Sequence, residues 1–124
     1  MLKYKLFIID DSGTTRKVIE SYLRELDIEI HQYENPLTAL EEVDLHDPKV
    51  ILLDYRMPEI NGDEFMIKLS EKLKIGESTT LLISGEDFSD DQKIGLRTLG
   101  VHKVIAKPIV KDELLEEVKA LLAA

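Results

Sequence analysis

Short apolar runs alternate along the chain with longer segments whose apolar residues recur at helical spacing. Each run is three to six residues long and is bounded by polar or turn residues, which is typical of a strand buried in a sheet. The second run alternates more weakly than the others but is also expected to be a strand. The predicted strands are Leu6–Ile9, Ile28–Tyr33, Val50–Leu53, Leu81–Ile83 and Val104–Ala106.

Between these strands, the spacing of the apolar residues predicts amphipathic helices. Asn35 followed by Pro36 has the residue types favoured at an N-cap and at the first helical position. Ser89 and Gln92 fit a capping box, and Gly100 stands where a helix C-terminus favours glycine. The predicted helices are Thr15–Leu26, Pro36–Val43, Glu64–Leu73, Ser89–Leu99 and Lys111–Leu122.

The order of these elements is five repeats of strand then helix, joined by short loops. This order predicts an α/β fold, a doubly wound parallel five-stranded sheet with helices on both faces and right-handed crossovers. No linker-like stretch separates two parts, so residues 1–124 are expected to form one domain. Ligands of such sheets bind beyond the carboxyl ends of the strands, so the strand-end residues are the candidates for function.

Composition and charge exclude several classes of protein. Hydrophobic residues make up 44% of the chain, there is no cysteine, and the net charge is −9. We therefore expect a globular protein without disulfides, and neither nucleic acid nor an anionic membrane as a direct partner. No apolar run approaches the ~18 residues of a membrane span, and a cytoplasmic location is the simplest interpretation. His31, His46 and His102 show no metal-ligand spacing and are interpreted as surface or loop residues.

Charged and hydroxyl side chains follow four of the five predicted strands: Asp10 and Asp11, Asp54, Ser84 and Lys107. Taken singly, each is more often a loop, cap or turn residue; taken together, they fall on one edge of the sheet. Three carboxylates at one edge repel one another and require a cation. Oxygen ligands select a hard ion, of which Mg²⁺ is the commonest in phosphate chemistry. A carboxylate nucleophile, a metal, an ammonium and a hydroxyl together indicate phosphoryl transfer to an aspartate.

At this point the sequence resembles the receiver domains of two-component response regulators, in particular the chemotaxis receivers. The family has an acidic pair after the first strand, D-x-x-M-P-x-x-x-G after the third, Ser or Thr after the fourth and Lys-Pro after the fifth. The corresponding residues here are Asp10-Asp11, Asp54–Gly62, Ser84 and Lys107-Pro108. The resemblance spans the whole chain, and it implies a flavodoxin-like fold with strand order 2-1-3-4-5.

The resemblance also implies a mechanism. A sensor histidine kinase or a histidine phosphotransfer protein would supply a phosphoryl group to Asp54, with Ser84 and Lys107 assisting. Asp11, Asp54 and the backbone carbonyl of Arg56 would contact Mg²⁺ directly, and Asp10 would act through water. Such a domain is not an enzyme in the ordinary sense, but it catalyses its own phosphorylation and dephosphorylation. The effector is unknown. The chain could be a stand-alone receiver or the receiver of a longer protein, and the sequence leaves both alternatives open.

Three details of this sequence add expectations. Receivers often carry Tyr or Phe three residues before the lysine, whereas this chain has Val104. The conformational switch is therefore expected in the loop after Ser84 and in the following helix. Arg56 and Glu86 flank the approach of water to Asp54 and could form an ion pair. The Lys107–Pro108 peptide bond is expected to be cis.

Three other functions fit parts of the pattern. A flavin-binding electron carrier would use Ser12–Thr15 to hold a phosphate, but Asp10 and Asp11 would repel that phosphate. A haloacid-dehalogenase-like phosphatase needs a second Asp two residues after its nucleophile, where this chain has Arg56. A degenerate receiver that acts only as a scaffold would be expected to lack some of the site residues, and none is missing here.

Overall fold

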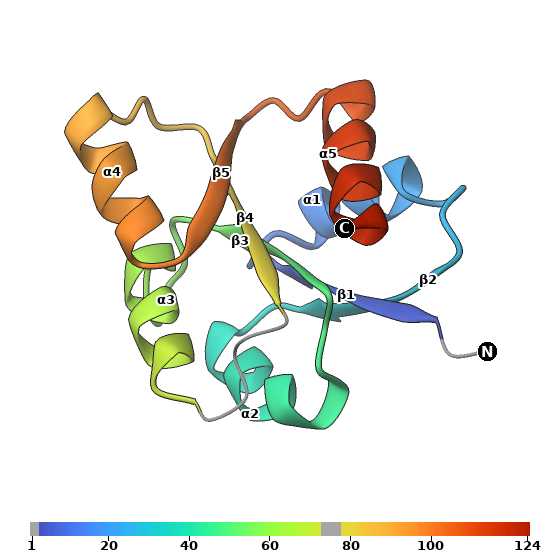
Figure 1. Cartoon of the computed structure of the whole chain (residues 1–124), viewed down its shortest axis with the longest axis horizontal. Helices are drawn as coiled ribbons and strands as arrows, with labels where there is room; N and C mark the ends of the chain where they lie inside the picture. Colours follow the sequence, from blue (N-terminus) through green and yellow to red (C-terminus); the bar gives the residue numbers. More distant parts are fainter. Residues whose placement is uncertain (1–2, 73–77) are drawn as a thin grey trace.

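The computed structural model describes residues 3–72 and 78–124, and these contain five strands and five helices in strict alternation (Figure 1). The strands are β1 (Tyr4–Ile9), β2 (Ile28–Tyr33), β3 (Val50–Asp54), β4 (Thr79–Ser84) and β5 (Val101–Ala106). The helices are α1 (Gly13–Tyr22), α2 (Pro36–His46), α3 (Gly62–Ser70), α4 (Asp90–Thr98) and α5 (Lys111–Ala123). The predicted elements are thus confirmed, although the third helix already ends at Ser70 and its predicted last residue, Leu73, lies outside the described residues.

All neighbouring strands are parallel and lie in the order β2-β1-β3-β4-β5, which confirms the predicted fold class. Figure 1 shows α1 and α5 on one side of the sheet and α2, α3 and α4 on the other. Successive side chains of a strand point to opposite faces. In β1, Leu6 and Ile8 therefore pack under α1 and α5, whereas Phe7 and Ile9 pack under the other three helices. This is why the central strands carry consecutive apolar residues rather than alternating polar and apolar ones.

Among the other helices, α1 and α2 differ most from the sequence-based prediction at their ends. Helix α1 ends at Tyr22 rather than Leu26, because the chain tightens there into a turn in which the Leu26 amide donates to the Leu23 carbonyl at 3.0 Å. Helix α2 continues to His46, beyond the predicted Val43. It ends where Asp47 adopts the left-handed conformation, with φ 48°. None of the helices in residues 3–72 and 78–124 has the length and apolar character needed to cross a bilayer.

Candidate phosphorylation site

Three carboxylates and one ammonium meet at the carboxyl ends of β1, β3 and β5. The carboxylates of Asp10, Asp11 and Asp54 each offer an oxygen within 4.8 Å of the others. The Nζ atom of Lys107 lies 3.0 Å from Oδ1 of Asp54 and 3.5 Å from Oδ2 of Asp10. Asp10 and Asp54 are buried, whereas Asp11 is exposed. The structure thus brings together the residues that sequence analysis selected from three separate parts of the chain.

The backbone around Asp10 holds its carboxylate in place. The Ser12 amide donates to Asp10 Oδ1 at 2.8 Å, and the Asp10 amide donates to the Tyr33 carbonyl at 3.1 Å. The guanidinium of Arg16 donates to the Asp10 carbonyl at 2.6 Å. These contacts tie the β1–α1 loop to the end of β2, so Asp10 is a fixed part of the site.

Burial and mutual repulsion shape the charges of this cluster. Burial, together with the nearby carboxylates of Asp10 and Asp11, raises the pKa of Asp54 even though Lys107 opposes the shift. Burial alone would lower the pKa of Lys107, but the hydrogen bond to Asp54 and the charge of Asp10 outweigh it, and the pKa is raised. Three ionised carboxylates and one ammonium leave a net charge of −2. An all-oxygen donor set with that charge fits a hard divalent cation such as Mg²⁺.

Ser84 is the last residue of β4 and is buried. Its Oγ accepts a hydrogen bond from the Glu86 amide at 3.0 Å, and its carbonyl accepts one from the Lys107 amide at 2.9 Å. The second bond joins the ends of β4 and β5, and so sets the position of Lys107 relative to Ser84. The Lys107–Pro108 bond is cis, as predicted.

The β3–α3 loop carries the motif that follows Asp54. Met57 and Ile60 are buried, and the Gly62 amide donates to the Tyr55 carbonyl at 2.7 Å. A Cβ atom added to Gly62 would lie 3.3 Å from the Asp54 carbonyl and 2.8 Å from a methyl group of Leu82. The motif glycine is therefore required by the close approach of α3 to β3 and β4.

Arg56 and Val104 occupy the positions at which sequence analysis raised open questions. Arg56 lies in the exposed loop after β3, and its Nε atom is 2.6 Å from Oε1 of Glu86. The two residues thus pair as the sequence allowed, while the role of the Arg56 carbonyl as a metal ligand stays a prediction. Val104 is half-buried and packs against the core beneath α2, α3 and α4.

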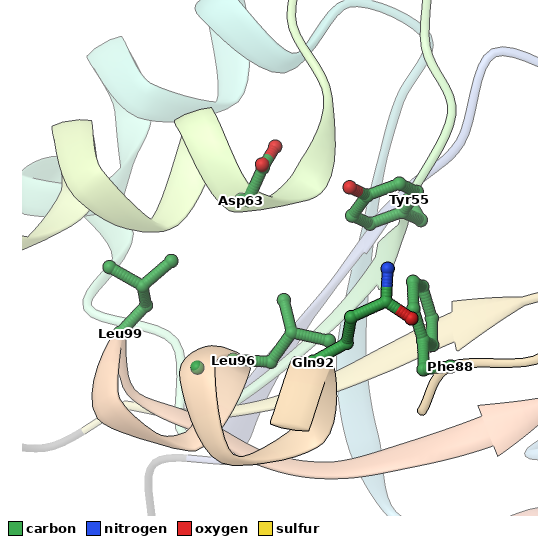
Figure 2. Close-up of a pocket in the computed structure, with 7 residues that line it drawn as sticks. Tyr55, Asp63, Phe88, Gln92, Leu96 and Leu99 are labelled. Carbon is green, nitrogen blue, oxygen red and sulfur yellow. The ribbon is translucent and has the colours of Figure 1, made fainter. Parts of the chain in front are cut away.

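A hollow of about 430 Å³ lies between α3 and α4, next to the Asp54 site (Figure 2). Tyr55 and Phe88 form one end of it, with ring centroids 5.1 Å apart in an edge-to-face arrangement. Leu96 of α4 and Leu99, which caps that helix, continue the wall, and Asp63 of α3 lies on the opposite side (Figure 2). Sequence analysis missed this aromatic pair. The available signal was that Tyr55 directly follows Asp54 and Phe88 directly precedes the helix cap at Ser89.

Two of the histidines that were interpreted as surface or loop residues lie instead in regular elements and are half-buried. His31 lies in β2 and His46 is the last residue of α2, both half-buried, with ring centroids 4.1 Å apart. Glu29 joins them, and the three side chains each offer a ligand atom within 4.8 Å of the others. Only the packing of α2 on β2 brings them together, so no spacing in the sequence indicates the cluster.

Comparison with known proteins places this geometry in a family. A model of the response regulator receiver domain matches residues 6–119. The chain belongs to this family. It is 31% identical over 120 residues to the chemotaxis protein CheY1 of Helicobacter pylori, covering 95% of this chain and 96% of that protein. It is 27% identical to the protein PilG of Pseudomonas aeruginosa, covering 94% of this chain and 85% of that protein.

Solved structures agree on the fold. The chemotaxis protein CheY4 of Vibrio cholerae superposes with a TM-score of 0.87 at 22% identity, covering 97% of this chain and 99% of that one. This chain is thus a CheY-like receiver domain of two-component systems, in a family of signalling phosphoacceptor domains. Receiver domains generally bind Mg²⁺ at an acidic pocket and act with histidine kinases and effectors. The family assignment decides against the flavin carrier and the haloacid-dehalogenase-like phosphatase.

Proposed function

We propose that this receiver is an active phosphoacceptor, in which Asp54 accepts a phosphoryl group from a sensor histidine kinase or a histidine phosphotransfer protein. The observation that carries the proposal is the placement of Lys107 Nζ, 3.0 Å from Asp54 Oδ1, beside the Asp10 and Asp11 carboxylates. A scaffold that never accepts a phosphoryl group has no need to keep three acids and one lysine together at a buried strand end. Residues 1–124 would act as one such domain, at a cytoplasmic location.

In the proposed reaction, an Asp54 carboxylate oxygen attacks phosphorus, and the bond from phosphorus to the donor's histidine nitrogen breaks. Lys107 stabilises the charge on the phosphoryl oxygens from its position beside Asp54. The Ser84 hydroxyl donates a hydrogen bond to the same group. Asp10, Asp11, Asp54 and the Arg56 carbonyl would hold Mg²⁺, which supplies further charge stabilisation when bound. Hydrolysis of the acyl phosphate by the domain itself would end the signal.

The output of the switch would pass through the β4–α4 loop. Ser84 ends β4 directly before this loop, and Phe88 within the loop contacts Tyr55 next to the proposed phosphoacceptor. The hollow between α3 and α4 leaves space for Phe88 and α4 to move when Ser84 turns toward the phosphoryl group (Figure 2). The effector that reads this change is unknown, and the net charge of −9 argues against nucleic acid or membrane as a direct partner.

The decisive experiment is phosphorylation by a small phosphodonor such as acetyl phosphate in the presence of Mg²⁺, followed by mass spectrometry. We expect one acid-labile phosphoryl group on the wild type and none on Asp54→Asn. Asp27→Asn changes an exposed carboxylate far from the site and should accept as the wild type does. Transfer to another residue would overturn the assignment of Asp54. Absence of uptake, also from a histidine-phosphorylated donor, would favour the scaffold.

A further inference from the structure

A second group of ligand-type side chains lies away from Asp54, near the amino ends of β1 and β2. Glu29 and His31 are two residues apart in β2 and therefore share a face of the sheet. His46 reaches them from the last turn of α2, and the three offer ligand atoms within 4.8 Å of one another. The buried Phe7, which is the register partner of His31 in β1, packs against both imidazoles.

A lysine ammonium lies beside two of these ligands. Nζ of Lys5 lies 3.3 Å from Nδ1 of His46 and 3.8 Å from Oε2 of Glu29. The His31 Nε2 atom lies 2.6 Å from the same Glu29 oxygen. An ammonium can only donate hydrogen bonds, so Nδ1 of His46 presents its lone pair toward the cation. Two of the three ligand atoms thus already face a positive charge, and His31 pairs with the Glu29 oxygen that faces this charge.

Outer partners set the orientation of His46. With Nδ1 accepting from Lys5, the ring proton is on Nε2, which lies 3.5 Å from Oε1 of Glu42. The same Glu42 oxygen accepts a hydrogen bond from the Tyr33 hydroxyl at 2.8 Å. A carboxylate next to the distal nitrogen of an imidazole is a common second partner of a metal-ligating histidine.

We propose that Glu29, His31 and His46 form a site for a divalent transition-metal ion of the Zn²⁺ type, which takes the place of the Lys5 ammonium. Two imidazole nitrogens and one carboxylate are ligands that suit Zn²⁺ rather than Mg²⁺. Zn²⁺ bonds of about 2.0–2.2 Å place tetrahedral ligands about 3.4 Å apart. Glu29 is exposed and Lys5 has a flexible stem, so side-chain rotation alone can close the cluster to that spacing.

This site is separate from the proposed phosphorylation site in position and in chemistry. The Asp54 cluster lies at the carboxyl ends of the strands and offers only oxygen ligands, whereas this site lies near the amino ends and offers two nitrogens. A bound ion would join the end of α2 to β2, which is an edge strand of the sheet. Binding to the folded state alone would therefore stabilise the protein.

The test is calorimetric titration with Zn²⁺ in excess Mg²⁺, which saturates the acidic pocket. We expect one Zn²⁺ per chain, and a rise in Tm of about 5–10 °C at a free Zn²⁺ concentration near 100 times Kd. His31→Gln and His46→Gln should each weaken binding by about tenfold or more, and Glu42→Gln by less. His102→Gln is the matched control, since His102 lies in β5 outside the cluster. In NMR spectra, Zn²⁺ should shift the ring signals of the two cluster histidines but not those of His102.

Weaker Zn²⁺ binding by the histidine variants could also result from loss of folding, so a variant with higher Zn²⁺ affinity is needed as well. Lys5→Met removes the competing ammonium and keeps an apolar stem, so it should bind Zn²⁺ several-fold more tightly than the wild type. Asp54→Asn should bind Zn²⁺ as the wild type does. Absence of Zn²⁺ binding, equal affinity in the wild type and both histidine variants, or weaker binding by Lys5→Met would each overturn the proposal. Loss of the Zn²⁺ signal in Asp54→Asn would place the ion at the acidic pocket instead.

Discussion

The Arg56 guanidinium and the Glu86 carboxylate form an ion pair across the rim of the Asp54 site, with Nε and Oε1 2.6 Å apart. Arg56 follows Asp54 by two residues, and Glu86 follows Ser84 by two. Both side chains are exposed, so screening by water leaves the pair with little effect on stability. We expect its importance to lie in position, because the sequence places both residues beside the approach of water to a phosphoryl group on Asp54.

The pair leads to a prediction about the lifetime of the phosphorylated state. A phosphoryl group carries a charge of about −1.5 to −2 and should draw Arg56 away from Glu86, so that the guanidinium shields phosphorus from water. Arg56→Ala should therefore lose its phosphoryl group several-fold faster than the wild type. Glu86→Gln frees Arg56 and should lose it more slowly. Rates from phosphate release test this, and unchanged or slower loss in Arg56→Ala contradicts shielding.

Stability should depend on the charge of Asp54. Burial and the nearby Asp10 raise the pKa of Asp54 in the folded state, so that state binds the proton more tightly than the unfolded chain does. The contribution of Asp54 to stability is then most favourable at low pH and declines as pH rises from 3.8 through the folded pKa. Without Mg²⁺, Asp54→Asn should raise Tm at neutral pH by a few degrees. This increase in Tm should vanish below pH 3.8. With Mg²⁺ bound, the variant should instead have a lower Tm than the wild type.

Those outcomes are measured by thermal unfolding monitored by circular dichroism across pH, with and without Mg²⁺. Asp27→Asn is a suitable control because its carboxylate is exposed. A Tm of Asp54→Asn at or below that of the wild type at pH 7 without Mg²⁺ would show that the Lys107 pair outweighs burial.

The two aspartates after β1 should differ in their effect on Mg²⁺ binding. Asp11 is exposed and is assigned a direct contact, so Asp11→Ala should weaken Mg²⁺ binding by about tenfold or more while leaving Tm nearly unchanged. Asp10 is buried and accepts from the Ser12 amide, so Asp10→Ala should weaken binding less but lower the stability by about 1–3 kcal/mol. Calorimetric titration with Mg²⁺ and thermal unfolding separate the two effects, and equal losses of affinity would count against the assignment.

Two glycines allow a test of packing around the site. Gly62→Ala would place a methyl group 2.8 Å from Leu82 Cδ1 and 3.2 Å from Tyr55 Cα, and should destabilise the fold by about 1–3 kcal/mol. Gly95 lies within α4, and a Cβ there meets no atom within 4 Å. Gly95→Ala should therefore stabilise by about 0.5–1 kcal/mol. Urea unfolding measures the free energy of unfolding of both variants. An unchanged value for Gly62→Ala would show that the Leu82 side chain moves aside at little cost.

The conformational switch should appear in α4 and the loop that precedes it. Val104 is small and half-buried, so it offers no aromatic ring to exchange position, whereas Phe88 contacts Tyr55 beside the site. Hydrogen exchange with and without beryllofluoride as a phosphoryl mimic should change in residues 85–98 and stay unchanged in α2. A response centred on Val104 with α4 silent would contradict this prediction.

The sequence by itself determined the order of the elements and the candidate residues of the site. Apolar periodicity is a local property, and in a parallel α/β sheet the end of each strand falls at the same edge whatever the packing details. Asp54, Ser84 and Lys107 could therefore be assigned to one place before any contact was known. The capping residues Asn35 and Ser89 could also be predicted from the sequence, because a cap acts within one helical turn.

Only the tertiary structure decided which side chains from different elements touch. The pairing of Arg56 with Glu86, the contact of Tyr55 with Phe88 and the stacking of His31 on His46 each join residues on two separate segments. Such contacts depend on the rotation and lateral position of each helix and loop on the sheet. Those are set by the packing of the whole core rather than by any local pattern, so the sequence could name the Asp54 site but could not reveal the histidine cluster.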